Sequence, residues 1–145
     1  MNILSGTRFG TVEFDGADVL QIEGGLVGLP DLRRFVLFEA KPGSPFSWLQ
    51  SLDEPSMAFL VADPARYVPE YEEKVARRCP EITDAVVLAT ANVPAGKPND
   101  TTLNLSGPIV VDATTRRGRQ MILDDTAYTT RHRVFPHAEP SRLAA

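Results

Sequence analysis

The residue types that most often carry out chemistry are scarce in this chain. Its 145 residues include one cysteine, Cys79, and two histidines, His132 and His137. Protein zinc sites use clustered cysteine and histidine ligands, and the sequence has no Cys-x-x-Cys or His-Glu-x-x-His motif. A cysteine nucleophile needs a neighbouring base, and Cys79 stands between an arginine and a proline outside any such motif. We therefore predict no metal site, no cofactor and no enzymatic activity.

Adjacent carboxylates and a glycine-rich segment are the remaining candidates for a reaction site or a phosphate site. Neighbouring side chains of an extended strand point to opposite faces, so neither Asp53–Glu54 nor Asp124–Asp125 can share one proton or one substrate. The segment GGLVG (24–28) has neither the dinucleotide-binding nor the P-loop spacing, and no long helix follows it. We interpret its glycines as turn residues that need positive φ. A hydrolase is disfavoured because no nucleophile–base pair is present.

The charges of the chain are unevenly distributed. The net charge is −4; residues 1–110 carry 15 acidic and 9 basic side chains, whereas residues 111–145 carry 6 arginines and 4 acids. An acidic body favours a basic protein partner over a phosphate backbone. We interpret TTRRGRQ (114–120) as a solvated hairpin turn with Gly118 in a left-handed conformation. The alternative is a small β-barrel RNA-binding module that uses Arg116, Arg117, Arg119 and Arg131.

The stretch SPFSWLQSLDEP (44–55) places the only tryptophan beside a glutamine on one face of a predicted strand. Trp48 either fills a barrel core or contacts a partner, since aromatic side chains suit both places. Gln50 is either a core amide whose hydrogen bonds are satisfied or a partner contact. Both alternatives stay open for each residue. The residues that share this face at a period of two are Phe46, Trp48, Gln50 and Leu52.

The elements that would position these residues are mostly strands, bounded by glycine, proline and aspartate. Residues 69–80 favour a short helix with a Glu73–Arg77 pair, although a strand through 71–75 competes. Residues 57–62 are apolar on both faces, which predicts a central strand covered on both sides. The other predicted strands are 7–14, paired as a hairpin with 19–22, then 34–40, 46–52, 85–93, 101–105, 109–112, 120–123 and 128–132.

These elements indicate an all-β fold with minor α content, namely a single-domain antiparallel β-barrel-like fold of about eight or nine short strands with one short helix. A doubly wound α/β fold would need several crossover helices, which the pattern lacks. We place the domain at residues 1–133 and a flexible C-terminal tail at 134–145. The sequence has no membrane-length apolar run, no secretory signal and a single cysteine, so we expect a cytoplasmic protein without membrane contact.

Four blocks of the sequence resemble the flagellar assembly factor FliW family. They are GGLVGLPDLRRFVLF (24–38), SPFSWLQSLDEPSMAFLVADP (44–64), TLNLSGPIVVDATTRRGRQMIL (102–123) and YTTRH (128–132). The resemblance implies a β-barrel-like fold with little helix and a non-enzymatic, chaperone-like role in flagellar assembly. It also implies two partners, the C-terminal region of newly made flagellin and CsrA, a basic RNA-binding repressor of flagellin translation.

The resemblance further implies that the protein is a partner switch. When flagellin is secreted, the freed factor binds CsrA away from its RNA groove and relieves repression of the flagellin message, without contacting nucleic acid itself. This sequence departs from the family pattern at a shorter 68–84 segment, at Glu54 and at Ser106–Gly107. The shorter segment predicts a reduced helical arm.

We predict partner contacts at two places in the chain. One is the strand that carries the tryptophan and the glutamine, and the other is an acidic stretch whose charge suits a basic partner. The predicted partner-binding residues are Trp48, Gln50, Glu70, Glu72 and Glu73.

Overall fold

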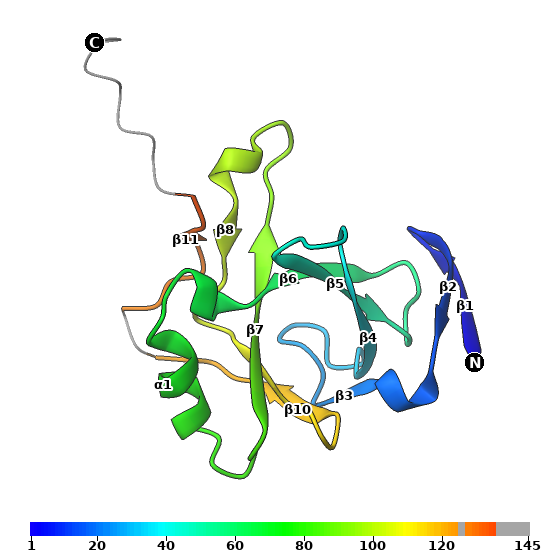
Figure 1. Ribbon diagram of the computed structural model, residues 1–145, viewed down its shortest axis with the longest axis horizontal. Helices are drawn as coiled ribbons and strands as arrows, with labels where there is room; N and C mark the ends of the chain where they lie inside the picture. Colours follow the sequence, from blue (N-terminus) through cyan, green and yellow to red (C-terminus); the bar gives the residue numbers. More distant parts are fainter. Residues whose placement is uncertain (125–126, 136–145) are drawn as a thin grey trace.

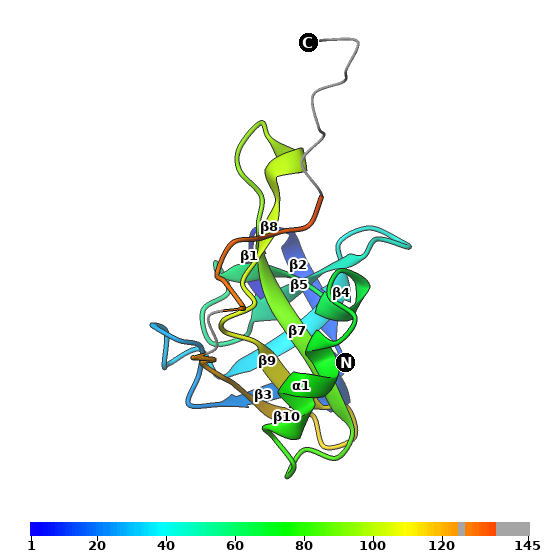
Figure 2. The same ribbon diagram turned by 90° about the vertical axis from the view of Figure 1, so that its left-hand side faces the viewer.

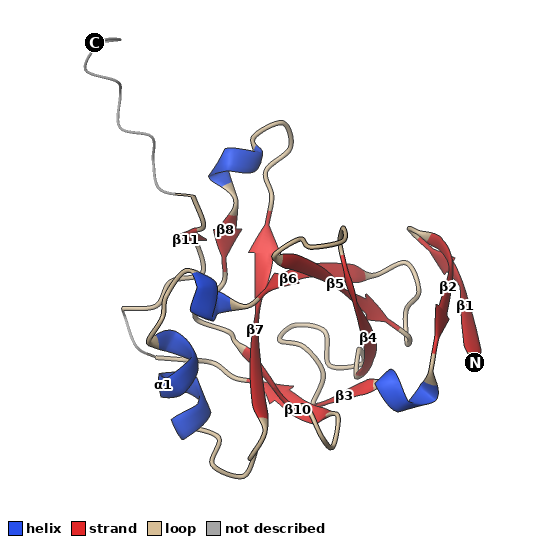
Figure 3. Ribbon diagram, in the orientation of Figure 1, coloured by secondary structure: helices blue, strands red, loops and turns tan. Residues whose placement is uncertain are grey.

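The computed structural model describes residues 1–124 and 127–135, and these residues form mainly short strands and the loops between them (Figures 1 and 3). The helical elements in this part of the chain are three 3₁₀ turns, η1 (Gly16–Asp18), η2 (Pro64–Arg66) and η3 (Pro98–Asp100), and one α-helix, α1 (Tyr71–Arg77). The strands are β1 (Asn2–Thr7), β2 (Gly10–Phe14), β3 (Leu20–Glu23), β4 (Arg34–Glu39), β5 (Phe46–Ser51), β6 (Ala58–Ala62), β7 (Ala85–Asn92), β8 (Thr102–Leu103), β9 (Ile109–Asp112), β10 (Arg117–Gln120) and β11 (His132–Arg133).

The strands are organised into two sheets. β1 and β2 form a separate two-stranded sheet, and the others form a 9-stranded sheet in the order β11-β8-β7-β6-β5-β4-β3-β10-β9. An additional pairing between β7 and β9 joins this sheet back onto itself, so that its strands surround a common interior (Figure 1). The pairs are antiparallel except β3 with β10, which run parallel. The predicted all-β, barrel-like fold with one short α-helix is confirmed.

Two clusters of apolar side chains form the core. The inner cluster fills the barrel and includes Phe35, Leu49 and Leu88. The outer cluster lies between the barrel and α1 and includes Tyr71 and Val87. Because Val87 and Leu88 are neighbours in β7, this strand is covered on both faces. Figure 2 shows α1 lying across β7.

The prediction that residues 57–62 form a central strand covered on both sides holds only for the end of β6, where Val61 faces the inner cluster and Ala62 the outer one. In β6, Val61 and Ala62 are buried, but Ala58, Phe59 and Leu60 are only half-buried. The reason is the position of α1, which packs against β7 and η2. The outer face of β6 is therefore left partly open.

The N-terminal strands also differ from the prediction. Residues 7–14 comprise the last residue of β1, a tight turn and β2; Thr7 Oγ1 closes the turn by donating to Gly10 O at 2.5 Å and accepting from Phe9 N at 3.1 Å. The predicted hairpin between 7–14 and 19–22 is wrong. β2 pairs with β1, and β3 pairs with β4 and β10.

The segment predicted as an arginine-bearing turn is largely a strand, β10. A Cβ added to Gly118 would lie 2.0 Å from the carbonyl oxygen of Val110. Glycine is thus required for the close approach of β9 and β10, and the left-handed conformation belongs to Arg116, with φ of 64°. The predicted left-handed Gly118 and the predicted strand at 120–123 are both wrong in position.

The glycine-rich loop before β4 has the predicted turn geometry. Gly24, Gly25 and Gly28 have φ of 75°, 70° and 80°. A Cβ on Gly25 would also lie 2.5 Å from the carbonyl oxygen of Pro30. The interpretation of these glycines as turn residues is confirmed, and Gly25 has a steric reason in addition.

The last described residues pack against the barrel. β11 pairs with β8, and Val134 is buried in the outer cluster. Residues 125–126 and 136–145, which include Asp125 and His137, lie outside the described residues, so the predicted tail from 134 stays a prediction. In the part of the chain that the structure describes, no helix has the length and apolar character needed to cross a membrane.

Candidate partner-binding surfaces

Trp48 lies on the outer face of the barrel, beneath the turn of the β1–β2 hairpin. It stands opposite Phe38 of β4 and Leu60 of β6. The ring of Phe9 packs against both Trp48 and Phe38, with 5.2 Å between ring centroids in each pair. The guanidinium carbon of Arg8 lies 4.6 Å from the Trp48 ring centroid, a cation–π contact. Trp48 is thus half-buried in a surface cluster of aromatic rings and is not part of the interior core.

Gln50 is buried and fixes the turn that follows β5. Its exposed fraction is 0%. Its Nε2 donates to the carbonyls of Ser51 and Pro55, both at 2.9 Å, and to that of Met57 at 3.2 Å. Both N–H donors of the Gln50 amide are therefore used in hydrogen bonds within the protein. The structure places Gln50 as a core amide that offers no surface to a partner. Its donors are satisfied, but among the described residues its buried Oε1 has no hydrogen-bond partner, so the predicted satisfied amide is confirmed only for Nε2.

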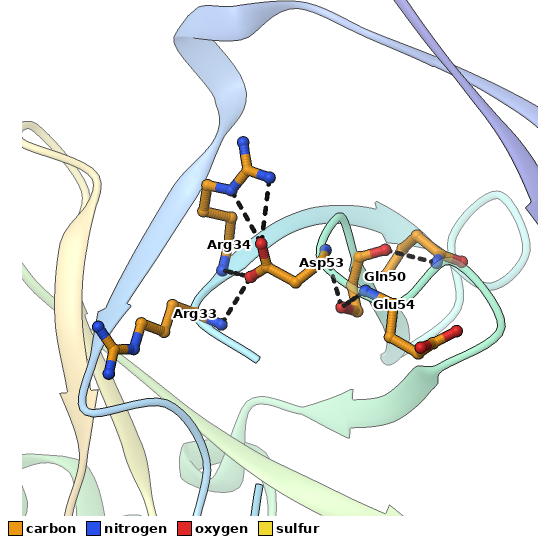
Figure 4. Close-up of polar contacts among 6 residues, drawn as sticks. Arg33, Arg34, Gln50, Asp53 and Glu54 are labelled. Atoms are coloured by element: carbon orange, nitrogen blue, oxygen red, sulfur yellow. Dashed lines mark hydrogen bonds and ion pairs between the residues drawn. The ribbon is translucent and has the colours of Figure 1, made fainter. Parts of the chain in front are cut away.

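Asp53 ties the same turn to the start of β4 (Figure 4). Its Oδ2 accepts from the backbone N–H groups of Arg33 and Arg34, both at 2.8 Å, and its Oδ1 lies 3.1 Å from the guanidinium of Arg34. Desolvation raises the pKa of Asp53, but these two amides and the Arg34 guanidinium together outweigh it and hold the pKa below its ordinary value. The predicted turn at Asp53–Glu54–Pro55 is confirmed.

The acidic stretch at α1 is not a free negative patch. Glu70 lies 4.0 Å from the amine of Lys74, and Glu73 forms an ion pair with Arg77, each pair one helical turn apart. The predicted Glu73–Arg77 pair is confirmed. The side chains of Glu70 and Glu73 are largely exposed, at 84% and 70%. Because each glutamate is paired with a cation one turn away, its charge is partly neutralised within the helix.

Glu72 is the exception among the three predicted glutamates. Within the described residues it forms no ion pair. Partial burial, together with the nearby carboxylate of Asp63, raises the pKa of Glu72 above its ordinary value. Ionisation of Glu72 is therefore less favourable in the folded chain than in a free glutamate side chain.

Tyr71 anchors α1 on the barrel. The side chain is fully buried, and its hydroxyl donates to the carbonyl of Leu105 at 2.5 Å. Its ring packs at a tilt against Tyr128, with 4.8 Å between centroids. Burial, with a smaller contribution from Tyr128, raises the pKa of Tyr71 far above its ordinary value. The anchor fixes which side of α1 faces solvent.

The predicted partner-binding residues fall into two separate places. Figure 1 shows α1 and the β1–β2 hairpin on opposite sides of the barrel, and Figure 2 shows α1 in front of β7 with β1 and β2 behind it. We call the first place the tryptophan surface (Arg8, Phe9 and Trp48). The second is the helix surface (Glu70, Glu72 and Glu73).

Two of the four arginines of the RNA-binding alternative contact the protein itself through their side chains. Arg116 donates to a backbone carbonyl of η1 at 2.9 Å, and Arg119 forms an ion pair with Glu81 at 3.0 Å. Arg117 is exposed, but it lines a shallow pocket together with the carboxylates of Glu81 and Asp112. Carboxylates beside these arginines would oppose a phosphate backbone. The geometry therefore gives the RNA-binding alternative little support.

Cys79 is placed as a core residue. Its Sγ lies 3.0 Å from the sulfur of Met121 and 3.4 Å from a guanidinium nitrogen of Arg119. Burial raises the pKa of Cys79, and the Arg119 charge offsets that rise only in part. A buried thiol that keeps its proton is a poor nucleophile, so the geometry offers no role for Cys79 in covalent catalysis.

Arg8 and Phe9 are surface residues that the sequence analysis missed. Their segment alternates like a strand, which hid the turn. Gly6 and Gly10, with φ of 81° and 79°, flank the two residues and were the available local signal. The contact with Trp48 had no local signal, because it joins residues far apart in the sequence.

Comparison with known proteins covers almost the whole chain. The FliW protein family model matches residues 3–134. The chain belongs to the FliW family. The flagellar assembly factor FliW of Moorella thermoacetica is 36% identical over 137 residues, which cover 89% of this chain and 85% of the relative. That of Magnetococcus marinus is 34% identical over 146 residues, which cover 97% of this chain and 89% of the relative.

A solved FliW structure has the same fold. The crystal structure of the flagellar assembly factor FliW matches with a TM-score of 0.80 and 32% identity, over 95% of this chain and 100% of that chain. The resemblance carried by the four sequence blocks is therefore confirmed. The FliW match at 3–134 contains both the tryptophan surface and the helix surface. The FliW relatives are named for flagellar assembly and not for a reaction.

Proposed function

We propose that this FliW-family chain regulates flagellin production by binding two protein partners in turn. The partners are the C-terminal region of flagellin and the translational repressor CsrA. While flagellin accumulates, the chain is bound to flagellin. Once flagellin is secreted, the freed chain binds CsrA and relieves repression of flagellin translation. The exchange takes place in the cytoplasm and requires neither a reaction nor direct contact with nucleic acid.

The observation that carries this proposal is the similarity to FliW across residues 3–134. Two features of the molecule support it. The tryptophan surface and the helix surface lie on opposite sides of the barrel and offer two candidate places for contact with a partner (Figure 1). The net charge of −4 suits a basic repressor.

Isothermal titration calorimetry tests the proposal directly. The full chain is titrated with the C-terminal segment of flagellin and, separately, with CsrA, both from the same organism. We expect saturable binding of each, and we expect added flagellin segment to displace CsrA from a preformed complex. Absence of binding to either partner at roughly tens of micromolar would contradict the proposal.

The helix surface is tested by charge reversal. In the double variant Glu70→Lys and Glu73→Lys, association with CsrA should slow about three- to tenfold at low salt, because the partner is basic. Glu13→Lys, an exposed reversal on the separate β1–β2 sheet, is the control for each single variant, Glu70→Lys or Glu73→Lys, because each changes the net charge by the same amount. Circular dichroism checks that α1 stays folded. An unchanged association rate would mean that the helix surface does not face CsrA.

A salt titration distinguishes the RNA-binding alternative. Binding to RNA through phosphate contacts would weaken steeply as salt rises. We expect no measurable affinity for a single-stranded RNA even at low salt. Salt-sensitive binding that is lost in the variant Arg117→Gln would favour the alternative instead.

A further inference from the structure

The edge of β6 that faces β7 is only partly paired. Pairing between these strands is confined to Val61 with Thr90 and Ala62 with Ala89. β6 continues to residues 58–60, whereas beyond Thr90 the pairing of β7 is with β8, on the edge of β7 opposite to β6. Within the described residues, 58–60 therefore have no strand pairing on the β7 side. An unpaired edge presents backbone donors and acceptors to another chain.

A groove of about 500 Å³ lies between the diverging ends of β6 and β7. Its walls combine apolar and polar surface, and Arg8 is the single charged residue among those that line it. This volume is within the range of about 300–1,000 Å³ that is usual for binding pockets. Its main lining residues are Ala58, Leu60, Thr90, Val93, Trp48 and Arg8.

Arg8 is held at the groove without a partner for its charge. The guanidinium carbon lies 4.6 Å from the Trp48 ring centroid and 5.6 Å from that of Phe9. In the part of the chain that the structure describes, no carboxylate lies within ion-pair distance of Arg8. A cation–π contact uses the face of the guanidinium and leaves its N–H donors for a carboxylate.

We propose that this groove binds an extended segment of a partner protein by strand addition to the edge of β6. An Asp or Glu side chain of that segment pairs with Arg8. An apolar side chain two residues away, on the same face of the added strand, packs on Trp48 and Leu60. The free edge of three residues spans about 10 Å, enough for such a pair of side chains. The inference holds whether or not flagellin or CsrA supplies the segment.

Trp48 makes the binding directly observable, because it is the only tryptophan in the chain. A library of random heptapeptides is selected against the full chain, and the enriched peptides are synthesised with blocked ends and titrated by Trp48 fluorescence. We expect an acidic residue with an apolar residue two positions away, and a saturable fluorescence change. The variant Arg8→Gln should weaken binding about three- to tenfold. Arg66→Gln, which removes another exposed arginine, should leave it unchanged.

Main-chain recognition is tested with two N-methylated forms of the same peptide, one methylated at the odd-numbered amides and one at the even-numbered amides. Only one of these sets faces the edge of β6, so one form should lose binding and the other should keep it. The proposal is overturned if no selected peptide changes Trp48 fluorescence, if the selected peptides lack an acid, or if neither methylated form nor Arg8→Gln weakens binding. Analytical ultracentrifugation of the free chain tests whether a second copy of the chain occupies the groove. A dimer that competes with the peptide and is lost in Arg8→Gln would assign the groove to a second copy and overturn the proposal.

Discussion

On the tryptophan surface, Arg8 stacks on aromatic rings and has no carboxylate partner among the described residues. On the helix surface, by contrast, Lys74 and Arg77 pair with two of the three glutamates. Sequence charge alone ranks these places the other way round, because three glutamates stand out and a single arginine does not. The difference teaches that the charge available to a partner depends on what each side chain already contacts. Substitutions that remove the contacts beneath each surface distinguish how the two are supported.

The buried amide of Gln50 supports the strand that carries Trp48. Replacing it by Leu removes the donors for three backbone carbonyls, so we expect the free energy of unfolding to fall by about 2–4 kcal/mol. Urea unfolding followed by far-UV circular dichroism measures the change. Gln50→Glu, which keeps the shape but brings acceptors against acceptors, should be at least as damaging. A loss below about 0.5 kcal/mol for both variants would mean that these bonds do not support the turn.

The hydroxyl of Tyr71 plays the corresponding part under the helix surface. Tyr71→Phe keeps the ring and leaves the Leu105 carbonyl without its donor, so the free energy of unfolding should fall by about 1–2 kcal/mol. Tyr128→Phe, a change in the ring that packs on Tyr71, is the matched control and should cost less. If Tyr71→Phe and Tyr128→Phe have the same midpoint of urea unfolding, the Tyr71 hydroxyl adds nothing, and the helix is held by ring packing alone.

Asp53 makes the stability of the turn depend on pH. Because its folded-state pKa is below the unfolded value, its carboxylate contributes stability that is fully present above about pH 4 and is lost as pH falls through the folded pKa. Asp53→Asn should therefore lower the free energy of unfolding by about 1 kcal/mol at pH 7 and by less at pH 3. Glu54→Gln, at the exposed neighbouring position, should show no such trend. A loss equal at both pH values would refute the assignment.

Glu72 should behave in the opposite way to Asp53. Its raised pKa means that the folded state binds its proton more tightly than the unfolded state, so ionisation of Glu72 lowers stability as pH rises. Glu72→Gln should raise the free energy of unfolding by about 0.5 kcal/mol at pH 7 and leave it unchanged at pH 3. Asp63→Asn should reproduce part of the gain, because it removes the neighbouring charge. Destabilisation by Glu72→Gln at pH 7 would show that the carboxylate is favourably placed.

The predictable part of this fold is the set of strands whose sequence pattern reflects burial. β4, β5, β7 and β9 lie close to their predicted positions because apolar runs bounded by glycine, proline or aspartate specify them locally. α1 is predictable for a similar reason, since Tyr71 and Val75 lie one turn apart and both are buried. The turn at Asp53 follows from its residue types.

The less predictable part depends on contacts between distant segments. Gly118 has turn chemistry in the sequence, yet its role is to let β10 approach Val110. Arg8 alternates with its neighbours like a strand residue, and only the folded hairpin brings it to Trp48. The choice between core and partner contact for Gln50 needed the three carbonyls that surround it. Local patterns contain none of these distances.

The parallel pairing of β3 with β10 has a consequence for the order of events during folding. Gln21 stands opposite Arg117, so one seam of the barrel joins a segment near the beginning of the chain to one near its end. The entropy of closing so long a loop must be overcome before that seam contributes. During synthesis, β3 has no β10 partner until almost the whole barrel has left the ribosome. We therefore expect the complete barrel to form only after β10 has left the ribosome, in a step on the millisecond-to-second scale that is typical of non-local β-sheets.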